Sequence, residues 1–325
     1  MKSFRIMALA SVLAVVSSVA FAKYPERPIT FVVPFAAGGA TDVLARQFAE
    51  RMSRGAAQNI IVDNIPGAGG TIGAAKVAKS KPDGYTLLIG HVGYMAAAAG
   101  LYKELPYDPV KDFDAVARFP DTPLVLTCDP GKPYTTDIRS LVKYARDNPG
   151  RLTIANAGVG SSGHLIAALV TSQLKLQVTH VPYKGNAPAY SDIMGGRVDC
   201  LFDQSNTAMP QVKSGKVRGV VTTAIQRLPQ MPEIPTLAES ELPGFEAATW
   251  YGIFAPKGTP REAIHWVFDR FQEAMKDPDF TKKLVDAGYV MIPEAEQRPD
   301  ALAAYTREQV ELWKKVIADA GIPRQ

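Results

Sequence analysis

Two glycine-containing loops have the residue types needed to hold a negatively charged group. Main-chain N–H groups at the start of a helix have no partner within the helix, and the helix dipole adds positive charge there. A loop at such a helix start can bind a carboxylate or a phosphate without an arginine, and glycines let the ligand approach the backbone. The first loop consists of Phe35, Ala36, Ala37, Gly38 and Gly39, with Asp42 in the helix expected to begin near Thr41.

A plain connection between strand and helix would use the same residues, so this stretch alone leaves both interpretations open. Its spacing matches neither a P-loop nor a dinucleotide fingerprint. A second loop of similar composition contains Gly158, Ser161 and Ser162 and opens a helix at His164. We expect the two loops to face each other across a cleft.

A third loop follows the strand expected from Val178 and carries Tyr183, Lys184 and Gly185. The tyrosine ring could cover an apolar ligand body while the lysine or the Gly185 N–H meets an anion. A surface turn with a solvated lysine is the alternative. Asp203 ends a further short strand and completes the candidate set.

Histidine and serine are also the residue types of acid–base and nucleophilic catalysis. His91, at the end of the third expected strand, could offer a ring N–H to a ligand, or be an ordinary partially buried histidine. Ser161, Ser162 and His164 lie within one helical turn, which is a poor geometry for a catalytic triad. No GxSxG, HExxH or metal-ligand spacing occurs, so we expect no enzyme, metal or cofactor.

Alternating strands and helices position these loops. Strands are expected at 60–63 and 85–90, with a helix at 71–78 between them. Such βα units indicate a mostly parallel sheet, whose ligand crevice lies beyond the carboxyl ends of its strands. This rule places 35–39 and 91–94 on the same rim.

The alternation occurs twice, which indicates two α/β lobes. Pro120 and Pro123 interrupt the apolar runs around them and are expected to mark a crossing to the second lobe, because proline cannot continue a central strand. The run from Trp250 leads back, and the helices after it are expected to pack on the first lobe. We assign 23–122 plus 250–325 to lobe 1 and 123–249 to lobe 2. The two crossings would form a hinge.

The N-terminus indicates export. Lys2 and Arg5 precede an apolar run, and Ala20-Phe-Ala22 is a small-x-small cleavage site, so residues 1–22 are expected to be a signal peptide. No cysteine follows the cleavage site, so no lipid anchor is expected. Without Lys2 and Arg5 the formal net charge falls from +4 to +2, which gives no footprint for nucleic acid. For Cys128 and Cys200 we expect two buried thiols rather than a disulfide.

Taken in order, the motifs resemble those of the Bug, or TctC-type, extracytoplasmic solute-binding proteins of tripartite tricarboxylate transporters. The resemblance extends over essentially the whole chain after residue 22. The matching segments are Tyr24-Pro-Glu-Arg-Pro-Ile-Thr30, Val33-Pro-Phe35 with Gly38-Gly39 and Asp42, Pro66-Gly-Ala-Gly-Gly70, Pro82-Asp-Gly-Tyr-Thr-Leu-Leu88, Leu105-Pro-Tyr-Asp-Pro-Val-Lys-Asp-Phe113, Gly160-Ser-Ser162 with His164-Leu165, His180-Val-Pro-Tyr-Lys-Gly185, Val198-Asp199 with Phe202-Asp203, and Leu242-Pro-Gly-Phe245.

The resemblance implies a type II periplasmic-binding-protein fold, in which two α/β lobes close on a small carboxylate. Amino acids, di- and tricarboxylates and aromatic acids are the ligands of the family. The first-lobe loop 35–39, supported by Asp42, would hold one carboxylate, and 158–162 with 183–185 would close over the other end. Asp203 matches an acidic position near the cleft; its participation would allow an ammonium group on the ligand.

The expected partner is a membrane transporter of the tripartite tricarboxylate type, and the protein itself is expected to be a periplasmic monomer. The sequence departs from the common family pattern at Ala36-Ala37, where a proline pair is frequent, and at His91, where a small residue is frequent. A sensor that presents the same bound acid to a membrane receptor or kinase is the alternative function. Uptake of labelled acid after gene deletion would separate the two.

Overall fold

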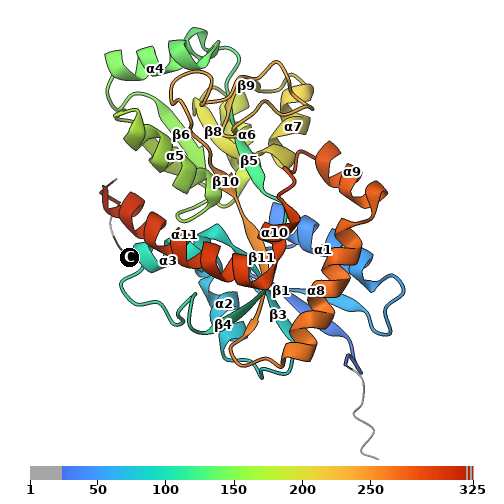
Figure 1. Cartoon of the computed structure of the whole chain (residues 1–325). Helices are drawn as coiled ribbons and strands as arrows, with labels where there is room; N and C mark the ends of the chain where they lie inside the picture. The colour runs from blue at the N-terminus through green and yellow to red at the C-terminus, as the bar shows by residue number, and fades with distance from the viewer. Residues whose placement is uncertain (1–23, 320, 323, 325) are drawn as a thin grey trace, which may run out of the picture.

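Two β-sheets, each covered by helices, form the two lobes of the computed structural model, which describes residues 24–319, 321, 322 and 324. The predicted signal peptide lies outside the described residues. Figure 1 shows the sheets one above the other, with the long C-terminal helix crossing beside their junction. Within the described part of the chain, no helix is both long and apolar enough to span a membrane.

The first sheet has the strand order β2-β1-β3-β11-β4. Its strands are β1 (Ile29–Val33), β2 (Ile60–Asn64), β3 (Thr86–His91), β4 (Phe113–Arg118) and β11 (Tyr251–Pro256). Strands β1, β2 and β3 are parallel, as the βα alternation predicts, whereas β11 runs antiparallel to both β3 and β4. Because β11 is the strand that returns from the second sheet, it enters in the opposite direction.

The helices of the first lobe are α1 (Ala40–Ser53), α2 (Thr71–Ala78), α3 (Ala98–Leu101), α8 (Arg261–Met275), α9 (Pro278–Asp286), α10 (Glu294–Gln297) and α11 (Pro299–Asp319). The C-terminal helices pack on this lobe as predicted: Leu302 of α11 is fully buried, and Phe271 of α8 stacks on Phe48 of α1. A π-helical segment, Gly93–Ala97, follows β3 and was not expected from the sequence.

The second sheet has the order β10-β5-β8-β6-β7, with β9 also paired to β5. Its strands are β5 (Thr122–Cys128), β6 (Thr153–Asn156), β7 (Thr179–Pro182), β8 (Cys200–Gln204), β9 (Arg218–Thr222) and β10 (Ala248–Thr249). Its helices are α4 (Ile138–Asp147), α5 (Ser162–Gln173), α6 (Asn186–Met194) and α7 (Ser205–Lys213). Helix α7, which contains Pro210, was not expected from the sequence.

The chain passes between the sheets along two neighbouring paths. Strand β4 leads through 119–121 into β5, and β10 leads through Trp250 into β11. The partners pair on both sides, β4 with β11 in one sheet and β5 with β10 in the other. Pro123 lies inside β5 rather than ending it, opposite Ala248 of the two-residue edge strand. The pairing of β5 with β8 begins only at Leu124, so the missing N–H of Pro123 leaves no gap in that ladder.

The two cysteines form a disulfide, which corrects the expectation of free thiols. Cys128 and Cys200 are directly paired on β5 and β8, and their sulfur atoms are 2.01 Å apart. Both residues are fully buried. A spacing of 72 residues carries no sign of this pairing in the sequence.

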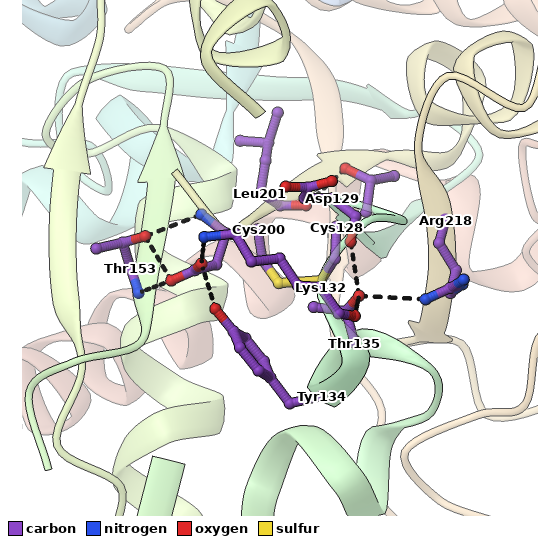
Figure 2. The surroundings of a disulfide bond; sticks show 11 residues. Cys128, Asp129, Lys132, Tyr134, Thr135, Thr153, Cys200, Leu201 and Arg218 are labelled. Carbon is purple, nitrogen blue, oxygen red and sulfur yellow. Dashed lines mark hydrogen bonds and ion pairs between the residues drawn. A yellow bond between two sulfur atoms is a disulfide. The ribbon is translucent and has the colours of Figure 1, made fainter. Parts of the chain in front are cut away.

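A buried carboxylate lies beside the disulfide (Figure 2). Asp199 accepts hydrogen bonds from the Thr153 N–H and hydroxyl, from the Tyr134 hydroxyl and from the Lys132 ammonium. Burial raises the pKa of Asp199, but these hydrogen bonds outweigh it, so the pKa lies below its usual value. The network fixes the outer end of the second lobe, away from the candidate loops.

Candidate ligand-binding cleft

The first candidate loop connects β1 to α1 and is held by Asp42. This buried carboxylate accepts the Gly38 N–H at 2.9 Å, the Arg46 Nε at 3.0 Å and the Asn64 amide at 2.9 Å. Burial raises its pKa, but the three donors outweigh this effect and the pKa is lowered. Gly38 has φ +82°, which favours glycine. Asp42 therefore supports the turn, as the resemblance implies.

The start of α1 remains open toward solvent. The four residues 36–39 are exposed, and Gly39 caps the helix without any side-chain hydrogen bond. The Gly39 N–H turns back to the Ala36 carbonyl at 3.4 Å. The first-turn N–H groups of α1 are thus not covered by a capping side chain, which is the condition for binding an anion.

His91 links the two lobes. Its Nδ1 accepts the Gly93 N–H at 2.9 Å, so the proton of the neutral ring is on Nε2, which donates to the Ser162 hydroxyl at 2.9 Å. The ring is buried, and burial lowers its pKa to about 3. Both ring nitrogens are therefore engaged within the protein, and the ring N–H that the sequence analysis offered to a ligand is directed at Ser162.

The Phe35 side chain packs at this contact. Its ring lies edge-on to the His91 ring at a centroid distance of 5.4 Å and tilted to the Tyr94 ring at 5.7 Å. Phe35 is half-buried, whereas the next residues are exposed. The first loop thus begins with an aromatic wall and continues with open backbone.

The second candidate loop meets the first lobe through its backbone. Gly160 lies so close to Gly93 that a Cβ on Gly93 would be 2.6 Å from the Gly160 carbonyl oxygen. Ser161 caps α5 by accepting the His164 N–H, and Gly158 donates its N–H to the Asn156 side chain. The start of α5 and the end of β3 are therefore neighbours.

The His164 ring lies apart from this contact. Its Nδ1 accepts the Gly160 N–H at 3.3 Å, and the ring packs edge-on to His180 at 5.7 Å. It lines a separate cavity of about 520 Å³ with His180, Thr171 and Ile322. Burial and then His180 lower its pKa to about 4. His164 thus supports the second loop from behind.

The third candidate loop leads into α6. Gly185 caps this helix with φ +103° and no side-chain hydrogen bond. The Tyr183 hydroxyl donates to Asp192 at 2.7 Å, so its polar end is held within the second lobe. The Lys184 side chain is exposed. Of this loop, the backbone at the start of α6 and the lysine remain available to a ligand.

Asp203 is buried and accepts four hydrogen bonds from the protein. It accepts hydrogen bonds from the Asn186 amide, the Tyr190 hydroxyl, the Gln204 N–H and the Thr207 hydroxyl, at distances between 2.5 and 2.8 Å. Burial raises its pKa to about 6 despite these bonds. Three of these bonds end on Oδ1 and one on Oδ2, and only 1% of the residue is exposed, so the carboxylate has no open surface for a ligand ammonium. Asp203 instead ties the starts of α6 and α7 together.

The start of α7 adds contacts between the lobes that the sequence analysis did not foresee. The Tyr251 hydroxyl donates to the Gln204 side chain at 2.6 Å. Next to it, the Ser205 hydroxyl donates to the Gly288 carbonyl, and the Asn206 amide donates to the Tyr289 hydroxyl. Because α7 itself was not predicted, no sequence signal pointed to these residues.

A cavity of about 560 Å³ lies elsewhere at the junction of the lobes and includes none of the candidate residues. Arg118 and Asp121 line it, and they form a buried ion pair at 2.7 Å. At the candidate residues, His91 and Tyr251 of the first lobe are instead hydrogen-bonded to Ser162 and Gln204 of the second lobe.

The serine–histidine pair in this cleft is not arranged as a nucleophile and its base. A general base would need an unprotonated nitrogen facing the hydroxyl, but the Gly93 N–H occupies Nδ1 and leaves the proton on Nε2, toward Ser162. Within the described residues, no group of three or more acidic, histidine or cysteine side chains could hold a metal ion. The arrangement is suited to holding an anion with neutral donors.

The chain is similar to known periplasmic binding proteins. Residues 44–322 match the family model of the tripartite tricarboxylate transporter family receptor, TctC. The structure of the periplasmic binding protein BugD is 37% identical, with a TM-score of 0.83, and covers 93% of this chain and 100% of its own.

Two similar structures contain a ligand. Rpa4515 of R. palustris with adipate is 34% identical, with a TM-score of 0.86, and covers 93% of this chain and 100% of its own. MatC of Rhodopseudomonas palustris with bound malate is 36% identical, with a TM-score of 0.82, and covers 90% of this chain and 100% of its own. Both ligands are dicarboxylates.

Proposed function

Because this chain belongs to the tripartite tricarboxylate transporter receptor family, we propose that it captures a small dicarboxylate in the periplasm and delivers it to a membrane transporter. The two lobes would close over the acid, with 35–39, supported by Asp42, on one side and 158–162 and 183–185, supported by Asp203, on the other. We also propose the lobe boundaries 23–122 plus 250–325 and 123–249, and that the protein acts as a monomer.

One observation supports this proposal: the start of α5 in the second lobe meets the first lobe where His91 contacts Ser162, and Phe35, in the loop before α1, packs on the His91 ring. Helices α1 and α6 begin at glycine caps without side-chain hydrogen bonds, and α5 begins at Ser161 beside the interlobe contact. Helix starts on facing lobes can each take one carboxylate of the same ligand. The adipate and malate bound by two similar proteins have this form.

The state of Asp203 favours an acid without an ammonium group. Its carboxylate is buried and accepts four hydrogen bonds from the protein, and Lys184 is the one candidate residue with a positive charge. An amino acid would leave its ammonium without a carboxylate partner, which costs free energy in a closed cleft. A plain or hydroxylated dicarboxylate would not have this cost.

Isothermal titration of residues 23–325 tests the ligand class. We expect malate or adipate to bind saturably and aspartate to bind at least about tenfold more weakly. Benzoate, with one carboxylate, serves as the comparison for the second anion position. Equal and weak heats for all four acids would contradict the proposed pocket.

Delivery to a transporter is tested in cells. Deletion of the gene should lower uptake of the labelled acid that the purified protein binds, and expression of the chain should restore it. Normal uptake by the deletion strain would argue against the transport role.

A further inference from the structure

Unpartnered polar atoms gather where the chain crosses between the sheets. Among the described residues, seven buried side-chain nitrogen or oxygen atoms have no hydrogen-bond partner. Five of them belong to Arg118, Asp121, Thr122, Asn206 and Thr249. These residues all lie at the junction of the lobes, where each buried polar atom without a partner costs folding free energy.

The two threonines are the clearest case. Thr122 and Thr249 are both fully buried, and the Oγ1 atom of each lacks a partner. They are opposite each other in the antiparallel pair of β5 and β10, so their side chains lie side by side on one face. Valine has nearly the same shape and would avoid the cost of a buried, unbonded hydroxyl. Packing alone therefore does not account for two hydroxyls here.

The face that carries Thr122 is turned toward α5. Side chains alternate along a strand, so Thr122 points to the same side as Leu124, which shares a hydrophobic cluster with Leu165 of α5. Strand β5 runs antiparallel to β8, and β8 runs parallel to β6, which precedes α5. Strand β5 and helix α5 thus run in the same direction, and the first residue of the strand is level with the first turn of the helix.

Thr249, the partner of Thr122, also lies near the start of α5, as the contacts of the two residues after it show. The carbonyl of Trp250, the residue after Thr249, accepts the Val92 N–H at 3.3 Å, and Tyr251 is paired with His91. Both threonines therefore lie beside the end of β3 and the start of α5, where His91 donates to Ser162.

We propose that the Thr122 and Thr249 hydroxyls form the floor of the ligand cleft and donate hydrogen bonds to one carboxylate of the bound dicarboxylate. This inference rests on the proposed function and deepens it, because it names residues that select an acid group. A carboxylate is an acceptor only, and each hydroxyl has a donor to offer. An ammonium at this end would face donors and the neutral His91 ring.

The test is titration of Thr122→Val and Thr249→Val with malate and adipate, together with thermal melting. Each substitution removes a donor to a charged group, so we expect a loss of affinity of about tenfold or more. The melting temperature should stay the same or rise, because no protein hydrogen bond is lost. The serine variants, which keep the hydroxyl, should retain most of the affinity.

Thr127→Val is the matched control. This buried threonine is on the same strand, but its hydroxyl donates to the Leu201 carbonyl at 3.0 Å. The control should melt at a lower temperature and bind normally. Wild-type binding with equal affinity in both valine variants would overturn this inference and leave the proposed function standing. Absence of binding by the wild type itself would overturn the proposed function, and this inference with it.

Discussion

His91 donates its Nε2 proton to Ser162 across 71 residues of sequence and between two different lobes. The bond needs a neutral ring of one tautomer, and the Gly93 N–H on Nδ1 fixes that tautomer. The end of β3 and the start of α5, which lie far apart in the sequence, are therefore held together by the His91 ring and the Ser162 hydroxyl.

Removal of this hydroxyl should weaken both the fold and the closed form. In Ser162→Ala the buried His91 N–H loses its acceptor, which costs about 1–3 kcal/mol of unfolding free energy. Chemical denaturation measures this loss, and titration with malate should show weaker binding. The exposed Ser191→Ala serves as the control. Unchanged stability and affinity in Ser162→Ala would show that the contact has no energetic role.

The first loop can be tested with a pair of glycine variants. Gly39 has an extended backbone, and a Cβ there would meet only the Ala36 carbonyl at an ordinary 3.5 Å. Gly39→Val should therefore keep the wild-type melting temperature and lose binding, because the side chain covers the helix start. Gly38→Val, at φ +82°, should also lose stability. Wild-type affinity in Gly39→Val would leave the loop with a connecting role only.

Asp203→Asn should destabilise the protein by about 2–4 kcal/mol at pH 7.5. The amide keeps only one acceptor oxygen, so its NH₂ group would face either the three donors on Oδ1, including the Asn186 amide, or the Tyr190 hydroxyl on Oδ2, which could then no longer donate. Denaturation with urea measures the loss, and Asp286→Asn at the surface is the control. A loss no larger than in the control would contradict the donor network around Asp203.

Acid should destabilise the wild type partly through His164. Burial and His180 lower its pKa to about 4, so between pH 4 and 6.5 the unfolded chain binds a proton that the folded chain does not. The contribution of His164 is therefore present above pH 6.5 and lost as the pH falls toward 4. Between pH 7.5 and 5, His164→Asn should lose about 2 kcal/mol less than the wild type. Other groups such as Asp121 contribute equally to the pH dependence of the unfolding free energy in the variant and in the wild type, so their contributions cancel in the difference. Parallel pH profiles would contradict a neutral His164.

Replacement of both Cys128 and Cys200 by alanine should lower the unfolding free energy by about 4 kcal/mol, the loop-closure value for a bridge spanning 72 residues. Binding should persist, because the bridge is at the opposite end of β5 from Thr122. Melting with and without reductant measures the first effect and titration the second. Equal melting temperatures would indicate that the bridge adds nothing to stability.

The sequence was informative where local patterns decide the structure. The predicted helix at 71–78 and the predicted strand at 60–63 agree with α2 and β2, because glycines and apolar runs mark these elements in the sequence. The two-lobe fold was also predicted from a local pattern, the βα alternation that restarts after Pro123, and the two sheets confirm it.

The parts that could not be predicted depend on long-range contacts. Helix α7 begins with polar residues and contains Pro210, so its sequence has no clear helical stripe. The partner of His91 is 71 residues away, and the pairing of the cysteines depends on the register of β5 against β8. None of these contacts leaves a periodic or spaced signal in the chain.

The chain passes from the first sheet to the second after β4 and returns after β10, and this path determines which lobe can fold first when the chain emerges N-terminus first. All strands of the second sheet lie before residue 250, whereas the first sheet needs β11, and its outer layer needs α8, α9 and α11. The N-terminal strands β1, β2 and β3 therefore cannot complete their sheet until β11, in the last quarter of the chain, is available. As the chain emerges, the second lobe can therefore complete its sheet first, while the sheet of the first lobe is still incomplete.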